Sequence, residues 1–475
     1  MTGRSLLVGP FNRVEGDLEI RLDIADGHVA AAYANSPLFR GFERIMLGKR
    51  PEDALTITPR ICGICSISQS MAAALALADL AKVQMPPEAM RVAALLHGVE
   101  NMCDHLSHFY LFFMPDFARP AYAGRPWHPR MAERFTAMAG SGQRRALEAR
   151  ARVLHIVGLL GGKWPHTLAI QPGGVTRAPT ARDRVRILAD LRQLRGFLEA
   201  DLFGAPAADF AALPDRAAFL GWDRGDAGLF LEAAADLGLA ALGRGPGRYL
   251  SWGGYPLPDG PGFPGGVYDG ALHPADPGRV TEDLSHAWML GATATPAEGQ
   301  TVPDEDMRDP AYSWCKAPRY DGRVIETGAM ARQAVAGGAL ARDIAHSGSL
   351  VDRVGGRLLE IARLMTVLED IVTGLRPEAR FMTDWPLPSE GEGTGLVEAA
   401  RGALGHWIRV EKGVIAGYQI VAPTTWNFSP RDAAGTPGPV EAALVGAPVA
   451  EGETVPLAVQ HIVRSFDPCM NCTVH

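Results

Sequence analysis

This sequence has few cysteines, no excess of positive charge and no long apolar run. Its 475 residues include only six cysteines, so the chain is not a scaffold held together by disulfides. The formal net charge of −7 gives no electrostatic reason to expect a nucleic-acid partner. No apolar segment is long enough to span a bilayer, and the first residues lack a signal-peptide pattern. We therefore expect a cytoplasmic protein without direct membrane insertion.

The length and composition are those of an ordinary protein with a large buried core. Hydrophobic residues make up 47% of the chain and charged residues 21%. A chain of 475 residues is long enough for one large core or for two merged subdomains. We find no internal repeat, and we predict a single domain over residues 1-475.

Helical periodicity dominates the chain after a β-rich start. Residues 5–35 are predicted to form strands, because Leu18, Ile20 and Leu22 alternate with charged side chains. Residues 243–280 are crowded with glycine and proline, and we expect a surface excursion, a small irregular β region or a partner-binding loop there. The pattern predicts an α+β fold that is predominantly α, with a helical-bundle core and small N-terminal and peripheral β regions. Helical patterns cover residues 71–83, 88–113, 143–160, 181–203 and 338–374.

Four of the six cysteines form two CxxC pairs near opposite ends of the chain. Cys62 and Cys65 lie in RICGIC, and Cys469 and Cys472 lie in DPCMNCTVH. Together they can supply four thiolates to a single soft-metal site. A structural zinc site usually places its second pair within about 15–20 residues of the first, whereas these pairs are far apart. The spacing alone also leaves open two separate dithiol redox motifs or two disulfides.

The residues around these cysteines decide between the alternatives. Matching segments run almost from end to end, and together they resemble the large subunit of a nickel–iron hydrogenase. This resemblance implies that the chain carries the active site for heterolytic cleavage of hydrogen into protons and electrons. The segments are RVEG at 13–16, FRGFE at 39–43, RICGIC at 60–65, DHLSHFY at 104–110, WCKAPRYDG at 314–322, ARGALGHW at 400–407, YQIVAPTTWN at 418–427 and DPCMNCTVH at 467–475.

The resemblance also implies a cofactor and a partner. Cys62 and Cys469 would be terminal thiolates of nickel, and Cys65 and Cys472 would bridge nickel to an iron that carries two cyanides and one carbon monoxide. Soft thiolates suit nickel and allow it to change oxidation state. The other two cysteines are too few to ligate a chain of iron–sulfur clusters, so these clusters would lie in a separate small subunit. Those two cysteines are expected to be buried and inert: Cys103 and Cys315.

Further residues match positions around the metals. Arg401 matches the arginine that overhangs the open side of the centre, where a guanidinium can polarise a bound molecule. Asp104 and Asp467 match the two aspartates that surround it. Thr424 matches a hydroxyl residue that donates to a cyanide. Ala400 departs from the usual proline, so the backbone contact to the other cyanide can differ.

Each of the charged residues also has a plainer interpretation. Arg401 could form a surface ion pair. Asp104 could lie on the exposed face of a helix with His105 and His108. Asp467 could merely cap the turn before a proline.

Two more sites follow from the resemblance. Glu15, in RVEG, matches the glutamate that passes protons outward, although it could instead be a half-exposed carboxylate at a strand end. Glu43, His475 and the backbone carbonyl of Ile420 match the ligands of a buried magnesium ion. Oxygen ligands suit such a hard cation, while a histidine ligand is less expected. In the plainer alternative Glu43 pairs with a nearby arginine and His475 is a frayed terminus.

Three departures from the common pattern point to one subgroup. Gln69 stands where most catalytic members have histidine, Ile64 where valine is common, and Phe112 where leucine is common. The combination resembles the regulatory, hydrogen-sensing hydrogenases. The larger side chains would narrow the gas channel and hinder oxygen more than hydrogen, although each alone could be neutral repacking. We therefore predict slow, oxygen-tolerant hydrogen oxidation that a histidine kinase reads as a signal. The alternatives are an energy-yielding uptake hydrogenase and a non-catalytic subunit of a redox complex.

Overall fold

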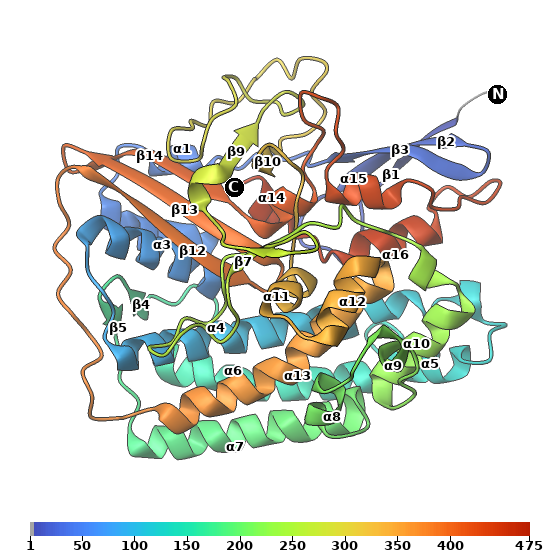
Figure 1. Ribbon diagram of the computed structural model, residues 1–475, viewed down its shortest axis with the longest axis horizontal. Helices are drawn as coiled ribbons and strands as arrows, with labels where there is room; N and C mark the ends of the chain where they lie inside the picture. The colour runs from blue at the N-terminus through green and yellow to red at the C-terminus, as the bar shows by residue number, and fades with distance from the viewer. Residues whose placement is uncertain (1–3) are drawn as a thin grey trace.

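The computed structural model describes residues 4–475. Long helices form the lower half of the molecule in Figure 1, where α4 packs against α6 and α13, and α6 packs against α7. The sheet of β12, β13 and β14, the N-terminal sheet and α3 lie above these helices in Figure 1. The helices are α1 (Phe42–Met46), α2 (Ala54–Ile57), α3 (Ser66–Ala81), α4 (Pro87–Ser107), α5 (His128–Phe135), α6 (Ser141–Gly161), α7 (Ala181–Phe197), α8 (Ala207–Ala211), α9 (Arg216–Leu220), α10 (Gly225–Asp236), α11 (Ala329–Ala336), α12 (Ala339–Ser347), α13 (Leu350–Gly374), α14 (Pro423–Asn427), α15 (Pro439–Leu444), α16 (Leu457–Ser465) and α17 (Met470–Thr473).

The strands form small separate sheets. The N-terminal sheet has the order β1-β2-β3, and the sheet near the C-terminus has the order β12-β13-β14, both antiparallel. The mixed architecture with a helical core confirms the predicted fold class. The strands are β1 (Arg4–Val8), β2 (Glu19–Ala25), β3 (His28–Asn35), β4 (Ile170–Gln171), β5 (Gly174–Val175), β6 (Tyr249–Ser251), β7 (Gly266–Tyr268), β8 (Leu272–His273), β9 (Val280–Asp283), β10 (Ala317–Tyr320), β11 (Glu326–Thr327), β12 (Gly391–Ala399), β13 (Gly402–Glu411) and β14 (Val414–Val421).

The longest predicted helix, over residues 338–374, is in fact two helices. α12 ends at Gly348, whose φ of 63° lies in the left-handed region that favours glycine. Ser349 then caps the start of α13, because its side chain accepts the N–H of Asp352 while the Asp352 side chain accepts the N–H of Ser349. The apolar periodicity continues across this break and therefore conceals it.

Other predicted elements differ from the structure mainly at their ends. The helix predicted over 88–113 is α4 followed by a π-helical turn at His108–Phe113, and α7 likewise ends in a π-helical turn at Leu198–Leu202. Residues 243–280 contain the short strands β6, β7 and β8, so they form a small irregular β region. The single-domain assignment stays a prediction. Within residues 4–475, no helix is both long and apolar enough to cross a bilayer.

The sheet of β12, β13 and β14 lies directly on α3. A Cβ atom added to Gly395 in β12 would lie against the carbonyl oxygen of Ala72 and 2.5 Å from the backbone nitrogen of Ala76. A Cβ on Gly393 would contact residues one turn further along α3, at Leu80. β12 therefore runs toward the N-terminal end of α3, which begins immediately after Cys65. The packing brings the β12–β13 hairpin to that cysteine.

We expect Gly395→Ala to destabilise the fold by about 1–3 kcal/mol, because the new methyl group overlaps the backbone of α3. The measurement is the thermal or urea unfolding midpoint of the purified chain. Gly158→Ala is the control, since a Cβ at this helical position meets nothing within 4 Å. Equal midpoints for the two variants would contradict the close packing of β12 on α3.

Candidate metal centre

Four buried sulfur atoms from opposite ends of the chain meet at one point. The Sγ atoms of Cys62 and Cys469 are 3.4 Å apart, and those of Cys65 and Cys472 are 3.2 Å apart. All four lie within 4.8 Å of one another, and all are free thiols. Disulfide sulfurs are about 2.05 Å apart, so these contacts are not disulfides. The two pairs form one cluster, which we call the cysteine cluster, rather than two separate redox motifs.

The first pair lies at the start of a helix. Cys65 directly precedes α3. The buried Glu100 of α4 accepts the backbone N–H groups of Ile67 and Ser68 at 2.8 and 2.9 Å. These N–H groups belong to the first turn of α3 and have no partner within the helix. Glu100 thereby anchors the end of α3 from which the loop of Cys62 and Cys65 extends.

The second pair is held by the N-terminal part of the chain. Glu15 and Cys469 form a parallel bridge, in which the N–H of Met470 donates to the carbonyl oxygen of Glu15 at 2.6 Å. The N–H of Cys469 donates to Oγ1 of Thr424 at 3.1 Å. The backbone of Cys469 is therefore held from two sides.

Arg40 joins the two cysteine loops to each other. Its Nη1 donates to the carbonyl oxygen of Ile61, next to Cys62, at 2.5 Å. The same atom donates to the carbonyl oxygen of Asn471, next to Cys472, at 3.0 Å. One guanidinium thus sets the separation of the two loops. Arg40 was not among the residues chosen from the sequence, although it lies in the FRGFE segment.

The four closely packed thiols differ in their pKa values. Hydrogen bonds from Cys469 and the other thiols hold the pKa of Cys62 well below that of a free thiol. Hydrogen bonds with Cys469 and its neighbours, together with burial, raise the pKa of Cys65 well above it. These two thiols therefore differ in how readily they lose a proton. Since metal ligation requires thiolates, a bound metal ion would displace the remaining protons.

Arg401 is buried beside the cluster between two carboxylates. Its Nη1 and Nη2 donate to the carboxylate of Asp104 at 2.5 and 3.1 Å. Nη2 also donates to Oδ1 of Asp467 at 3.1 Å, and Nε donates to the backbone oxygen of Asp467 at 2.8 Å. A second buried arginine, Arg357, donates to the other carboxylate oxygen of Asp467 at 3.3 Å. Two positive and two negative groups thus pair away from water, which excludes the surface-arginine interpretation.

The surroundings of the two carboxylates differ. Burial raises the pKa of Asp104 to about 7, in spite of the opposing charge of Arg401. Burial acts in the same direction on Asp467, but Arg401 and other nearby groups outweigh it and lower its pKa. Asp104 is 3% exposed, and both His105 and His108 are 0% exposed. The alternative of an exposed helix face is therefore wrong.

Glu15 lies between the cluster and the surface. Its side chain is half-buried, and burial is the largest influence raising its pKa. The negative charges of Cys62 and Asp467 add to this rise, while Arg401 opposes it. The carboxyl group is therefore close enough to the cluster to feel its charges and still has access to the outside.

Comparison with known proteins agrees with this arrangement. A family model described as nickel-dependent hydrogenase matches residues 40–125 and 231–475. This chain belongs to the nickel-dependent hydrogenases. Both cysteine pairs, Arg401 and Asp104 lie within the matched residues, whereas Glu15 lies before them.

Named relatives cover almost the whole chain. The large subunit of the periplasmic NiFeSe hydrogenase of Desulfomicrobium baculatum is 28% identical over 98% of this chain and 94% of its own length. The uptake hydrogenase large subunit of Rhodobacter capsulatus is 27% identical over 100% of this chain and 95% of its own length. The solved structure of the reduced Ni-Fe-Se hydrogenase of D. vulgaris Hildenborough has a TM-score of 0.88 and 28% identity, with full coverage of both chains. The present chain is thus the large subunit of a nickel-dependent hydrogenase.

A second polar cluster in this hydrogenase surrounds Glu43. The carboxylate accepts the N–H of Ile420 at 2.8 Å, and Nε2 of His475 lies 3.2 Å from it. Lys316, which sequence reasoning missed, places its Nζ 3.2 Å from Glu43 and 2.8 Å from Glu282. Glu43 and His475 are buried, so neither the surface pairing nor the frayed terminus is observed. Two carboxylates thus meet one ammonium group and one imidazole at this cluster.

Gln69 is buried in a short chain of hydrogen bonds. Its Oε1 lies 2.8 Å from Nε2 of His406, and Nδ1 of His406 lies 2.9 Å from the hydroxyl group of Tyr418. Burial lowers the pKa of His406 to about 3, so the ring is neutral and carries one N–H. An Oε1 facing Nε2 requires that N–H on Nε2, and the tyrosine hydroxyl then donates to Nδ1. Neither His406 nor Tyr418 was chosen from the sequence.

The two residues assigned to the gas channel are both half-buried. Ile64 lies between the first two cysteines of the cluster and packs against the main hydrophobic core. Phe112 lies in the π-helical turn after α4, and its carbonyl oxygen accepts an N–H of Arg13 at 3.3 Å. Their contribution to gas access stays a prediction.

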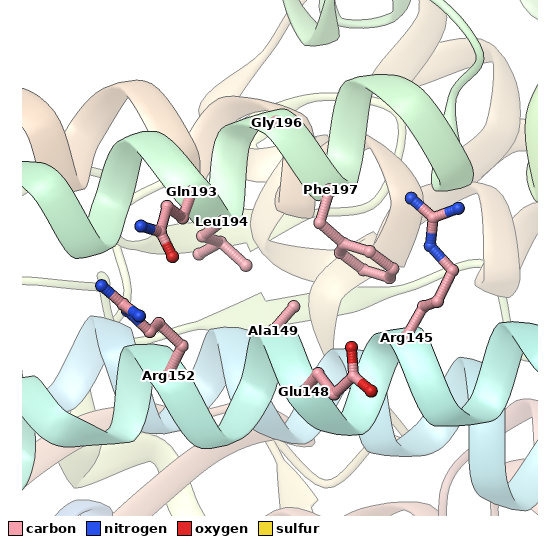
Figure 2. A pocket seen from close by; sticks show the side chains of 8 residues that line it. All are labelled: Arg145, Glu148, Ala149, Arg152, Gln193, Leu194, Gly196 and Phe197. Carbon is pink, nitrogen blue, oxygen red and sulfur yellow. The ribbon is translucent and has the colours of Figure 1, made fainter.

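A surface groove of about 380 Å³ lies between α6 and α7 (Figure 2). Arg145 and Arg152 stand at its two ends, with Glu148 and Phe197 between them. Arg145 is paired with Asp201 at 2.7 Å, and Arg152 with Asp190 at 2.8 Å. The arginines are thus already neutralised, and no lining residue belongs to the cysteine cluster. The groove therefore adds nothing to the metal centre.

We expect Cys62→Ala to lower the nickel content of the purified hydrogenase from about one atom per chain to near zero, because a soft metal loses one of its four thiolates. Elemental analysis measures this directly. Cys103→Ala is the matched control, since Cys103 is equally buried but lies outside the cluster. Full nickel retention in Cys62→Ala, or equal loss in the control, would contradict the assignment of the cluster.

Proposed function

We propose that this subunit oxidises hydrogen as the catalytic part of an uptake hydrogenase. The observation that carries the proposal is the cysteine cluster, four buried free thiols within 4.8 Å of one another. Names of relatives support the uptake role, since they include an uptake hydrogenase and the quinone-reactive hydrogenase of Wolinella succinogenes. The electrons released would enter an energy-yielding chain of carriers. The location in the cytoplasm remains a prediction.

The donor set suits the proposed nickel–iron centre. Cys62, Cys65, Cys469 and Cys472 would hold the nickel and the iron through their sulfur atoms. When bound, the centre supplies the redox chemistry that accepts the electrons of hydrogen. Thiolate is the ligand that soft, redox-active metals favour, and burial of all four sulfurs keeps water from competing with the substrate.

Arg401 and Thr424 would shape the space beside the metals. The guanidinium is fixed by two carboxylates and cannot rotate away, so it presents a preorganised positive charge to the open side. In a site without water such a charge acts more strongly than it would in solution. Thr424 would donate its hydroxyl hydrogen to one cyanide, and the backbone at Ala400 would approach the other.

Glu15 would carry the proton away from the cluster. It is attached to the Cys469 segment through the backbone and is half-buried, so its carboxyl group has one side toward the sulfurs and one toward the outside. Its raised pKa lets it hold a proton long enough to pass it on. Asp17, exposed two residues later, would receive protons at the surface.

Electrons would leave through a small subunit that contains iron–sulfur clusters. Gly63 and Ile64, between the first two cysteines, are half-exposed, and so is Asn471 between the last two. The cysteine loops therefore reach the surface at one place. A redox partner seated there would approach the metals more closely than anywhere behind the buried side of the cluster.

We also propose that a magnesium ion binds at the second polar cluster. Glu43 and Glu282 would provide negative charge, and His475 would be a further ligand. In this structure the N–H of Ile420, not its carbonyl oxygen, points toward Glu43. The role of this carbonyl oxygen as a magnesium ligand therefore stays a prediction. The two carboxylates and their buried surroundings are what support a hard cation here.

Hydrogen sensing is the second candidate, favoured by the surroundings of Gln69. The amide is held by His406 at 2.8 Å in a buried position, one helical turn after Cys65, whose carbonyl oxygen accepts the N–H of Gln69. Together with Ile64 and Phe112 it supports slow, oxygen-tolerant turnover. A histidine kinase would then read the state of the complex. The relatives named above favour the uptake role.

We expect Glu15→Gln to lower hydrogen-dependent dye reduction by about 10²- to 10⁴-fold, because the amide cannot carry a proton. Nickel content should stay unchanged. Glu19→Gln in β2 is the control, since Glu19 is also half-buried but bonds only to Asn35. Wild-type activity in Glu15→Gln would show that protons leave by another route, and no activity in the wild-type complex would overturn the proposed function.

The double variant Ile64→Val with Phe112→Leu separates the two candidate roles. If the chain is a sensor, its wild-type turnover is slow and persists in air, and the smaller side chains make dye reduction oxygen-sensitive by widening gas access. If it is an uptake enzyme, the wild type turns over rapidly and the variant changes little. Ile57→Val with Phe381→Leu is the control pair, because both residues are also partly buried against the core.

A further inference from the structure

Arg401 lies in the turn of the β12–β13 hairpin, where the two strands are no longer paired. Pairing stops at Ala399 and Gly402, so Ala400 and Arg401 form a two-residue loop, which we call the hairpin tip. The tip packs tightly on a neighbouring segment, since a Cβ on Gly402 would lie 2.5 Å from the backbone nitrogen of Gly328. The direction of the Arg401 guanidinium therefore depends on what fixes this tip.

Arg332 on α11 holds the hairpin tip by its backbone. Its Nη1 donates to the carbonyl oxygen of Ala399 at 2.7 Å, and its Nη2 to that of Ala400 at 2.9 Å. The other N–H groups bond to two carboxylates, with contacts of 2.8 Å to Glu360 and 2.8 Å to Glu398. All three charged residues are 0% exposed. A guanidinium has five N–H donors in a rigid plane, and an ammonium group with three cannot replace them.

Glu360 on α13 links this network to the carboxylate partner of Arg401. Its Oε1 lies 3.0 Å from Nε2 of His105, and His105 directly follows Asp104 on α4. Burial lowers the pKa of His105, so the ring is neutral and donates through Nε2–H. Burial would raise the pKa of Glu360, but Arg332 outweighs it and lowers the pKa to about 2. One charged carboxylate thus accepts from α4 and from Arg332 together.

We propose that Arg332 and Glu360 are positioning residues for Arg401, an inference that rests on the proposed function. Arg332 fixes the backbone on which Arg401 is mounted, and Glu360 ties that backbone to the helix turn that bears Asp104. Arg401 and Asp104 are thereby held in a fixed position relative to each other. Neither residue contacts a cysteine of the cluster, so both act through the hairpin tip, which carries Arg401, and through Asp104.

The test is a double-mutant cycle in the assembled holoenzyme. Arg332→Lys keeps the charge but loses the two carbonyl contacts, and should lower the rate of hydrogen oxidation by about 10- to 100-fold, as expected for a misplaced catalytic group. When Arg332→Lys is added to the Arg401→Lys variant, the rate of hydrogen oxidation should fall by less than about twofold, because the side chain that Arg332 positions is already changed. The infrared bands of the diatomic ligands should shift in Arg332→Lys, which reports the site independently of turnover.

Arg319→Lys is the matched control. Arg319 is also buried, and it bonds to the carboxylate of Asp432 at 3.0 Å and to the carbonyl oxygen of Pro430 at 3.2 Å, away from the hairpin tip. The Arg319→Lys variant should lose about as much thermal stability as Arg332→Lys. Its rate of hydrogen oxidation and its infrared bands should stay unchanged. If Arg332→Lys does not assemble, Glu360→Gln provides the same readouts.

Equal losses in the wild-type and Arg401→Lys backgrounds would overturn the inference, and so would wild-type rate and bands in an assembled Arg332→Lys. An active wild-type complex with these results overturns the positioning role alone. An inactive wild-type complex overturns the proposed function and this inference with it.

Discussion

The structure depends on holding two cysteine loops, from opposite ends of the chain, at a fixed separation. Thiols gain little from packing against one another, so the cluster is not its own support. Arg40 bonds to carbonyl oxygens in both loops, and the backbone of Glu15 pairs with that of Cys469. Other elements of the fold also position residues at the cysteine cluster. α4 anchors the start of α3 through Glu100, and the sheet on α3 brings Arg401 to the same place.

A second constraint is that the charged residues around the cluster are buried. Such groups are tolerated only when each is paired and hydrogen-bonded. Arg401 and Arg357 balance Asp104 and Asp467, while Arg332 faces Glu360 and Glu398. Arginine recurs because its planar fork bonds to carboxylates and carbonyl oxygens together. The stiffness that results is useful chemically, since a charge that cannot reorient needs no reorganisation during reaction.

The sequence predicted the long helices and the N-terminal strands well, because their apolar periodicity is regular. It did not predict the sheet of β12 to β14, whose middle strand is buried on both faces and shows no alternation. The spacing of the cysteines alone did not show whether the two pairs form one metal site. The resemblance of the surrounding segments to hydrogenases predicted that they do. Arg332, Glu360 and Lys316 were missed because no local sequence pattern marks a charged residue as buried. The names of relatives favour the uptake role, whereas Gln69, Ile64 and Phe112 are the residues that favour sensing.

The most direct test of the central claim is X-ray absorption at the nickel edge of the purified complex. The account predicts nickel surrounded by sulfur ligands with an iron neighbour, since four thiolates converge on one bimetallic centre. A nickel bound by nitrogen and oxygen alone, or a complex that holds zinc at these sulfurs and no nickel, would contradict it.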